Sequence, residues 1–270
     1  MRKYVIAAAC AAASTTLACG AASADPSPDS TAVVPQAVIG GDYSHVWLNQ
    51  GLGDANVYGV DLGGITPLTT NLSGQVTGGY HRLDANGGGA DEWNVAGTLA
   101  YSLPVGRIGA NVGYVDAGLS GISGRVTNYG VYGEYYASPA VTLGLRGGGL
   151  TASANAFGLG GSRNGGYVGG EGVGYLTPDF AARATIGYVG VYGGHQWTAG
   201  VHGEYLLSEK TPLSAWVGYD YTNLGGNGFS VRGNTLSVGL KFYLGGGGSL
   251  EQHQRTGEDD WGPANLDLTH

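Results

Sequence analysis

Thr235-Leu236-Ser237-Val238-Gly239-Leu240-Lys241-Phe242-Tyr243-Leu244 alternates between two kinds of position along its whole length. In an extended strand, Leu236, Val238, Leu240, Phe242 and Leu244 share one face, and the intervening residues share the other. An apolar face opposite a polar face, at a period of two, predicts a β-strand between an apolar and a polar environment. The same alternation recurs upstream in residues 107–116 and 72–83.

Five prolines repeat at regular distances upstream of this strand, at intervals of 37, 35, 39 and 34 residues. Proline cannot donate a hydrogen bond to a β-ladder, so it belongs at a turn. A repeat that contains two alternating runs and a proline turn is typical of a β-hairpin. We therefore expect all five turns at one end of a sheet, namely those at Pro67, Pro104, Pro139, Pro178 and Pro212.

Strands read outward from these turns number twelve, and the segments between hairpins are rich in glycine and other turn-forming residues. The chain has 54 glycines, 18 tyrosines and 12% charged residues, which favours a β protein whose exterior is apolar. The predicted spans are 38–48, 56–65, 72–83, 92–102, 107–116, 126–137, 141–150, 166–176, 181–190, 197–207, 213–222 and 233–244.

A membrane location is the simplest explanation of that exterior. The exported part of the chain has no run of eighteen or more apolar residues, so a membrane-spanning form would be a closed barrel. Tyrosines gather near both ends of the predicted strands. Tyr167 and Tyr175 are eight residues apart, about 20 Å along a tilted barrel axis, which fits two aromatic belts. The alternative is a soluble sandwich or solenoid, in which tyrosine is present only as an ordinary strand former.

With these features the chain resembles bacterial outer-membrane β-barrel proteins of the porin type, over residues 38 to 244. The resemblance implies an all-β fold, a transmembrane antiparallel up-and-down β-barrel of about 12 strands with short loops. It also implies a location in the bacterial outer membrane, in contact with its lipid, with both termini and the proline turns in the periplasm. Phe242, Tyr243 and Leu244 are similar to the terminal signal that the barrel-assembly machinery recognises, although here residues 245–270 follow it.

The two ends of the chain predict export and an appendage. Residues 1–24 read as a signal peptide, 25–37 as a flexible leader, 38–245 as the barrel, and 246–270 as a glycine-rich linker with an acidic periplasmic tail. Cys10 and Cys19 fall in the signal peptide, and lipidation at Cys19 is an alternative with a poorly matching motif. The tail is expected to be a disordered appendage, or to dock through Trp261 on a partner or on the lumen mouth.

Charged residues at inward positions predict the lining of a lumen. Spacings of 12 residues across the proline turns suggest two cross-strand pairs, Glu134 with Arg146 and Glu171 with Arg183. Glycines at inward positions, such as Gly109, Gly130 and Gly239, are expected to leave the lumen open. The predicted pore-lining residues are Asp61, Arg107, Glu134, Arg146, Glu171, Arg183, Glu204 and Lys241.

The expected function is passive diffusion of small hydrophilic solutes or ions through a narrow charged lumen. A structural or surface-interaction barrel with a closed lumen is one alternative, and an outer-membrane lipid hydrolase is another. Such a hydrolase would carry its serine and histidine on the lipid-facing surface, whereas His81 and His202 are predicted to face inward. His45, which lies beside Ser44, and His195, which is expected in a loop, are the remaining candidates. The sequence otherwise predicts no enzyme, because a lone histidine in a strand or loop is typical of polar lining. No nucleophile elbow is present, although barrel hydrolases do not require one.

No cofactor or metal site is expected, because the histidines are scattered and the exported part has no cysteine. The 20 acidic against 12 basic residues disfavour nucleic acid as a partner. The oligomeric state has no signature in the sequence.

Overall fold

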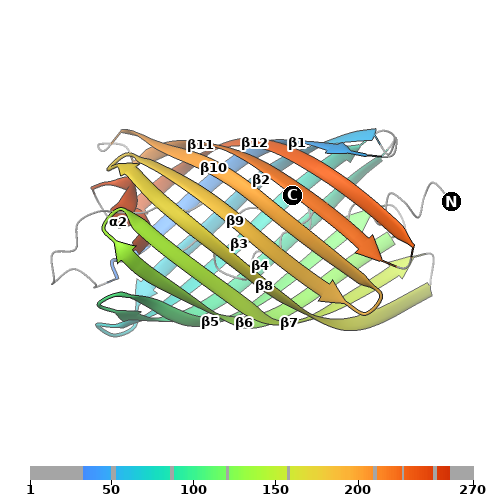
Figure 1. Cartoon of the computed structure of the whole chain (residues 1–270), viewed down its shortest axis with the longest axis horizontal. Coiled ribbons are helices and arrows are strands. Elements are labelled where there is room, and N and C mark those ends of the chain that lie inside the picture. The colour runs from blue at the N-terminus through green and yellow to red at the C-terminus, as the bar shows by residue number, and fades with distance from the viewer. Residues whose placement is uncertain are drawn as a thin grey trace.

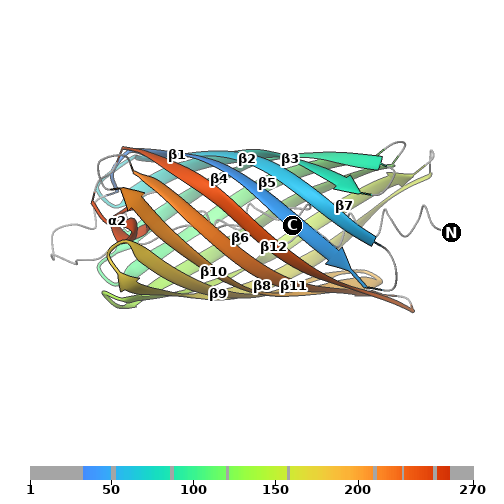
Figure 2. The same cartoon turned by 90° about the horizontal axis from the view of Figure 1, so that it is seen from above.

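Over the residues that it describes, the computed structural model of the chain shows a closed barrel of twelve antiparallel strands and one short helix (Figures 1 and 2). The residues described are 33–49, 53–85, 88–119, 122–156, 159–208, 212–226, 228–245 and 248–255. The elements are β1 (Gln36–Leu48), β2 (Gly53–Pro67), β3 (Leu72–Ala85), β4 (Gly88–Leu103), β5 (Gly106–Leu119), β6 (Ile122–Ser138), β7 (Val141–Ala156), β8 (Leu159–Thr177), β9 (Phe180–Val191), β10 (Gly194–Ser208), β11 (Leu213–Gly226), β12 (Phe229–Gly245) and α2 (Leu250–Arg255).

Each strand pairs with its neighbours in sequence, and β1 closes the ring by pairing with β12. The fold class is therefore confirmed. Gln36 lies opposite Gly245 in this closing pair, so the first and last strands begin and end at the same end of the barrel. That end also carries the five prolines, because each lies at or beside the connection between an even-numbered strand and the next. We call it the proline-turn end and the other the loop end.

The strands extend further toward the loop end than the alternation predicts. The predicted spans all lie inside observed strands, which run from 12 residues in β9 to 19 in β8. The segment Thr151 to Gly165, which lies between two of the predicted strands, instead continues β7 and β8 as a hairpin. The backbone hydrogen bonds of this hairpin do not require an apolar face on either strand. Across the pair, Thr151 contacts Asn164 and Ser153 contacts Ser162.

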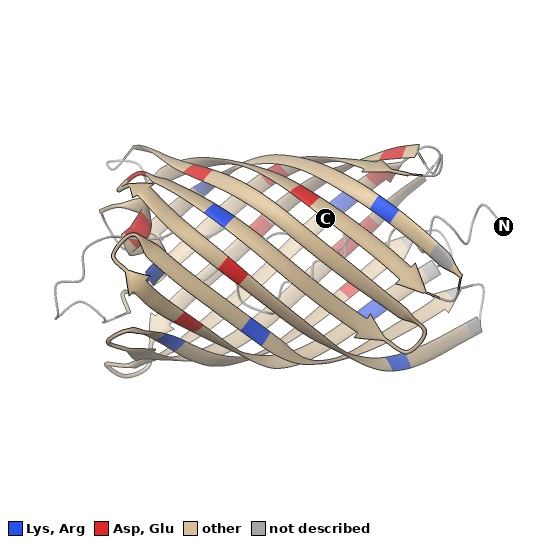
Figure 3. Ribbon diagram, in the orientation of Figure 1, with Lys and Arg blue, Asp and Glu red and all other residues tan. Residues whose placement is uncertain are grey.

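The outward face is apolar over most of its height and charged at the loop end. Exposed side chains such as Val76, Leu99 and Val131 form the apolar band. In the described strands, outward charges gather near the loop end, where Arg82 pairs with Asp91 and Arg125 with Asp116. Figure 3 shows how charged residues are spread along the strands. An apolar band that ends at charges is the exterior expected of a membrane barrel.

Some residues of the aromatic belts differ from those that the sequence predicts. Tyr167 and Tyr175 are 7% and 9% exposed and point into the lumen, so the argument from their spacing is wrong. Inward and outward positions alternate, and both tyrosines fall on the inward face of β8. Outward aromatic residues do occur at both ends: Tyr101, Tyr135 and Tyr205 near the prolines, and Tyr58, Tyr80, Trp93, Trp197 and Tyr219 toward the loops. Among the described residues, no helix has the length and apolarity required to cross a bilayer.

Candidate functional site

The candidate site is the lumen, and the predicted lining residues occupy its wall. Three ion pairs join different strands of the wall there: Arg107 with Glu134 at 3.3 Å, Arg183 with Glu171 at 3.3 Å, and Lys241 with Glu204 at 3.9 Å. In each pair an inward position of one strand meets an inward position of the next or next but one. From β5 to β10 the predicted lining residues alternate in charge, in the order Arg107, Glu134, Arg146, Glu171, Arg183 and Glu204.

Glu134 has a partner in the structure that the sequence analysis did not predict. Glu171 and Arg183 pair as expected, but Glu134 forms its ion pair with Arg107 across β5 and β6. The register of β6 with β7 places Glu134 opposite Gly144 and Arg146 opposite Tyr132. Glu134 and Arg146 are thus two positions out of direct register across β6 and β7, as Glu171 and Arg183 are across β8 and β9.

Large aromatic side chains lie over the inward glycines. A Cβ atom at Gly109 would overlap the Tyr132 ring, one at Gly130 the Tyr167 hydroxyl, and one at Gly239 the Trp216 indole. The expectation that these glycines leave open volume is therefore wrong. Glycine at these positions instead leaves room at the wall for an aromatic ring from another strand.

Helix α2 lies at the proline-turn end of the barrel, as both views show (Figures 1 and 2). On one side of the mouth, His253 stacks on Tyr243 of β12, with ring centroids 4.5 Å apart, and contacts Gln36 of β1 at 2.8 Å. On the other side, Arg255 donates hydrogen bonds to Thr142 of β7 and to the carbonyl of Ser138. Because β1 and β7 are six strands apart in a ring of twelve, α2 crosses the mouth from wall to wall.

Two further kinds of contact hold α2 in place. Its first residue, Leu250, is 1% exposed and packs with apolar residues of the wall that include Val38, Leu206 and Tyr243. At its other end, the Arg255 guanidinium lies over the Tyr136 ring at 4.6 Å. Apolar burial and a stacked cation together favour a docked helix over a freely moving tail. The sequence had suggested docking through Trp261, which lies outside the described residues.

His253 makes the docking of α2 sensitive to pH. Burial lowers the pKa of its imidazole below the ordinary value, and the Glu204 carboxylate opposes part of that shift. The docked helix therefore favours neutral His253. This stabilisation is complete above the ordinary pKa of about 6.5 and is lost as the pH falls below it.

Acidification is accordingly expected to loosen α2. Amide hydrogen exchange of residues 250–255, corrected for intrinsic rates, should be slow at pH 7.5 and faster at pH 5.5. In His253→Gln the difference between the two pH values should shrink, because glutamine does not titrate. Equal pH sensitivity in both proteins would assign the effect to other groups near the mouth, Glu204 and Glu251 among them.

The arrangement around Ser44 does not fit a hydrolase. Ser44 faces the lumen and donates its hydroxyl to Ser237 at 2.8 Å, whereas His45 faces outward and contacts Asn56 at 2.7 Å. Adjacent residues of a strand point to opposite faces, so this serine and histidine do not form a nucleophile and base. His81 and His202 face the lumen as predicted, and His202 pairs with Asp220 at 3.0 Å.

The sequence analysis missed some polar lumen residues. Asp42, Glu92 and Asp220 lie at inward positions of β1, β4 and β11. Counting every second residue along these strands from Ser44, Ala96 or Trp216 would have identified the three residues as inward-facing.

Comparison with known structures supports the same fold. The chain is similar to the translocator domain of the autotransporter NalP from Neisseria meningitidis, with a TM-score of 0.52 and 15% identity, covering 78% of this chain and 88% of that chain. It is also similar to the KdgM porin (TM-score 0.51, 12% identity, 76% and 99% covered) and the NanC porin (0.51, 13%, 76% and 100%). No family model and no curated protein sequence matches the chain. In fold, the chain is a closed β-barrel similar to those of these porins and of this translocator domain.

Proposed function

We propose that the chain is an outer-membrane channel for small hydrophilic solutes or ions, with both termini in the periplasm. The observation that carries this proposal is a lumen wall of alternating charges inside a barrel whose exterior is apolar. Twelve strands lie between the small barrels that side chains fill and the large porins that hold an aqueous channel, which suits a narrow pore. Two structural neighbours, KdgM and NanC, are porins by name.

Assembly and placement follow from the same proposal. The chain would be inserted by the barrel-assembly machinery through Phe242, Tyr243 and Leu244, with outer-membrane lipid around the apolar band. Phe242 and Leu244 are outward positions of β12, whereas Tyr243 faces the lumen and donates to Glu204 at 2.8 Å. Proline turns in the periplasm would place α2 at the periplasmic mouth.

Single-channel recording in a planar bilayer tests the proposal. The folded chain from residue 25 onward should give discrete conductance steps. Arg183→Gln should shift ion selectivity toward cations, because it removes positive charge beside Glu171 and leaves the carboxylate. Glu171→Gln should shift selectivity in the opposite direction. Arg125→Gln, which changes a charge on the outward face at the loop end, where Arg125 is 62% exposed, serves as a control with little expected effect.

A closed structural barrel is a second candidate, favoured by the position of α2 across one mouth. It predicts silence in the bilayer from a correctly folded barrel, both with α2 and after its removal. Conductance that appears only when α2 is removed would instead show a channel that this helix closes.

A further inference from the structure

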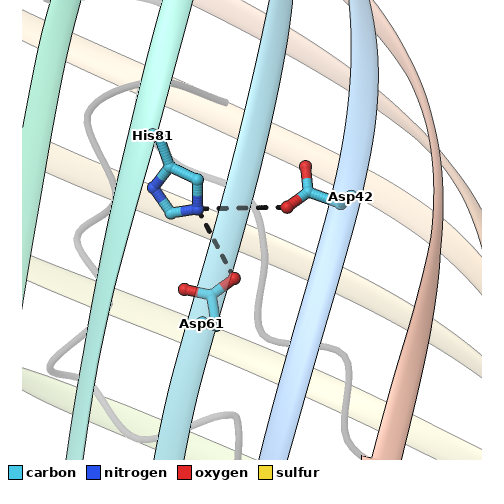
Figure 4. Close-up of side chains that lie close together, drawn as sticks. All are labelled: Asp42, Asp61 and His81. Carbon is cyan, nitrogen blue, oxygen red and sulfur yellow. Dashed lines mark ion pairs between the residues drawn. The ribbon is translucent and has the colours of Figure 1, made fainter.

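Asp42, Asp61 and His81 come together on the lumen wall from three neighbouring strands, β1, β2 and β3. Figure 4 shows the His81 ring pointing between the two carboxylates. Its Nε2 atom lies 3.4 Å from Asp61 Oδ2 and 4.0 Å from Asp42 Oδ1, and one donor atom from each residue lies within 4.8 Å of the other two. Donor atoms bound to one ion at about 2.1 Å lie roughly 3 to 4 Å apart. A small closing movement would thus give a three-donor site.

Two glycines keep the space between these side chains clear. Gly59 lies directly between Asp42 and His81 in the register of the three strands, and a Cβ atom there would overlap both side chains. A Cβ atom at Gly79 would overlap the Asp61 carboxylate. Any larger residue at either position would prevent the three donors from converging.

The surroundings of His81 suit a metal-bound imidazole. Glu92 Oε1 lies 4.0 Å from Nδ1, on the side of the ring away from the two aspartates. Carboxylates commonly hold the second nitrogen of a metal-bound histidine from this position. Asp42, Asp61 and Glu92 place three carboxylates around this imidazole. A divalent cation would offset the repulsion between the carboxylates. The Asp61 side chain is 50% exposed, which gives an ion access to the cluster.

We propose that Asp42, Asp61 and His81 bind a divalent transition-metal ion, with Glu92 positioning the imidazole. One nitrogen and two carboxylate donors favour ions such as Zn²⁺ over Mg²⁺ and Ca²⁺, which prefer all-oxygen sites. A bound ion would join β1, β2 and β3 and would lower the negative charge of this part of the lumen. The site does not depend on whether the barrel conducts.

Calorimetric titration of Zn²⁺ into the untagged, chelator-treated barrel in detergent micelles tests the proposal. One Zn²⁺ per chain is expected, with excess Mg²⁺ failing to displace it. His81→Gln should weaken binding by about 100-fold or more. Gly59→Ala should also weaken it, although every donor is still present. His202→Gln is the matched control, because His202 faces one aspartate at 3.0 Å in another part of the lumen.

Circular dichroism should show that each variant is folded, and Asp42→Asn replaces any variant that is not. Equal Zn²⁺ affinity in the wild type, His81→Gln and Asp42→Asn would overturn the proposal and leave the cluster as an ion-pair network of the wall. Loss of binding in His202→Gln but not in His81→Gln would overturn it as well.

Discussion

Truncation after Gly248 is expected to raise single-channel conductance roughly twofold or more, because the narrowest part of a pore dominates its resistance. The change removes α2, whose contacts run from Gln36 and Tyr243 on one side of the mouth to Thr142 and Ser138 on the other. The open mouth would be bounded by the wall alone. Planar-bilayer recordings of the two proteins under the same salt conditions provide the measurement.

Truncation after Arg255 is the matched control for this prediction. It removes residues 256–270, including the acidic residues and Trp261, but keeps every contact described for α2. Its conductance should equal that of the full chain. If both truncations gave the same increase, the obstruction would lie beyond residue 255. If neither changed the conductance, α2 would not limit the pore.

The fold could be predicted from the sequence because the strands of a membrane barrel place apolar residues toward lipid and polar residues toward the lumen at alternate positions. The apolar and polar faces of residues 235–244 appear in β12 as expected, with Leu236, Val238 and Leu240 outward and Lys241 and Tyr243 inward. The turns at one end of the barrel could be predicted for a second reason, which is that proline is excluded from the ladder. At the loop end, where the strands leave the apolar band, this pattern fades, and there the predicted spans were too short.

The lumen was harder to predict, because it depends on register and on how side chains lie across strands. The spacing of charges across one turn did not show that Glu134 pairs with Arg107 of the preceding strand. Local sequence also cannot show that Tyr167 lies over Gly130 and Gly148 on two other strands. The cluster around His81 was missed for a similar reason: its donors are about twenty residues apart in sequence and become neighbours only in the sheet.

Arg107→Gln is expected to destabilise the barrel by about 3 to 5 kcal/mol, the usual cost of removing one partner of a buried ion pair. Two guanidinium nitrogens of Arg107, Nε and Nη2, each lie 3.3 Å from a different oxygen of Glu134, and the two side chains are 1% and 6% exposed. Loss of the guanidinium therefore leaves the Glu134 carboxylate in a poorly solvated position. The measurement is the free energy of unfolding in urea, followed by tryptophan fluorescence.

Two comparisons separate this cost from a general loss of charge. The double variant Arg107→Gln with Glu134→Gln should recover much of the stability, since it removes the carboxylate as well. Arg125→Gln breaks the more exposed pair with Asp116 at the loop end, where Arg125 is 62% exposed, and should cost less than about 1 kcal/mol. Equal losses in Arg107→Gln and Arg125→Gln would mean that the lumen pair is as well solvated as the surface pair, and hence that water fills the lumen down to the level of α2.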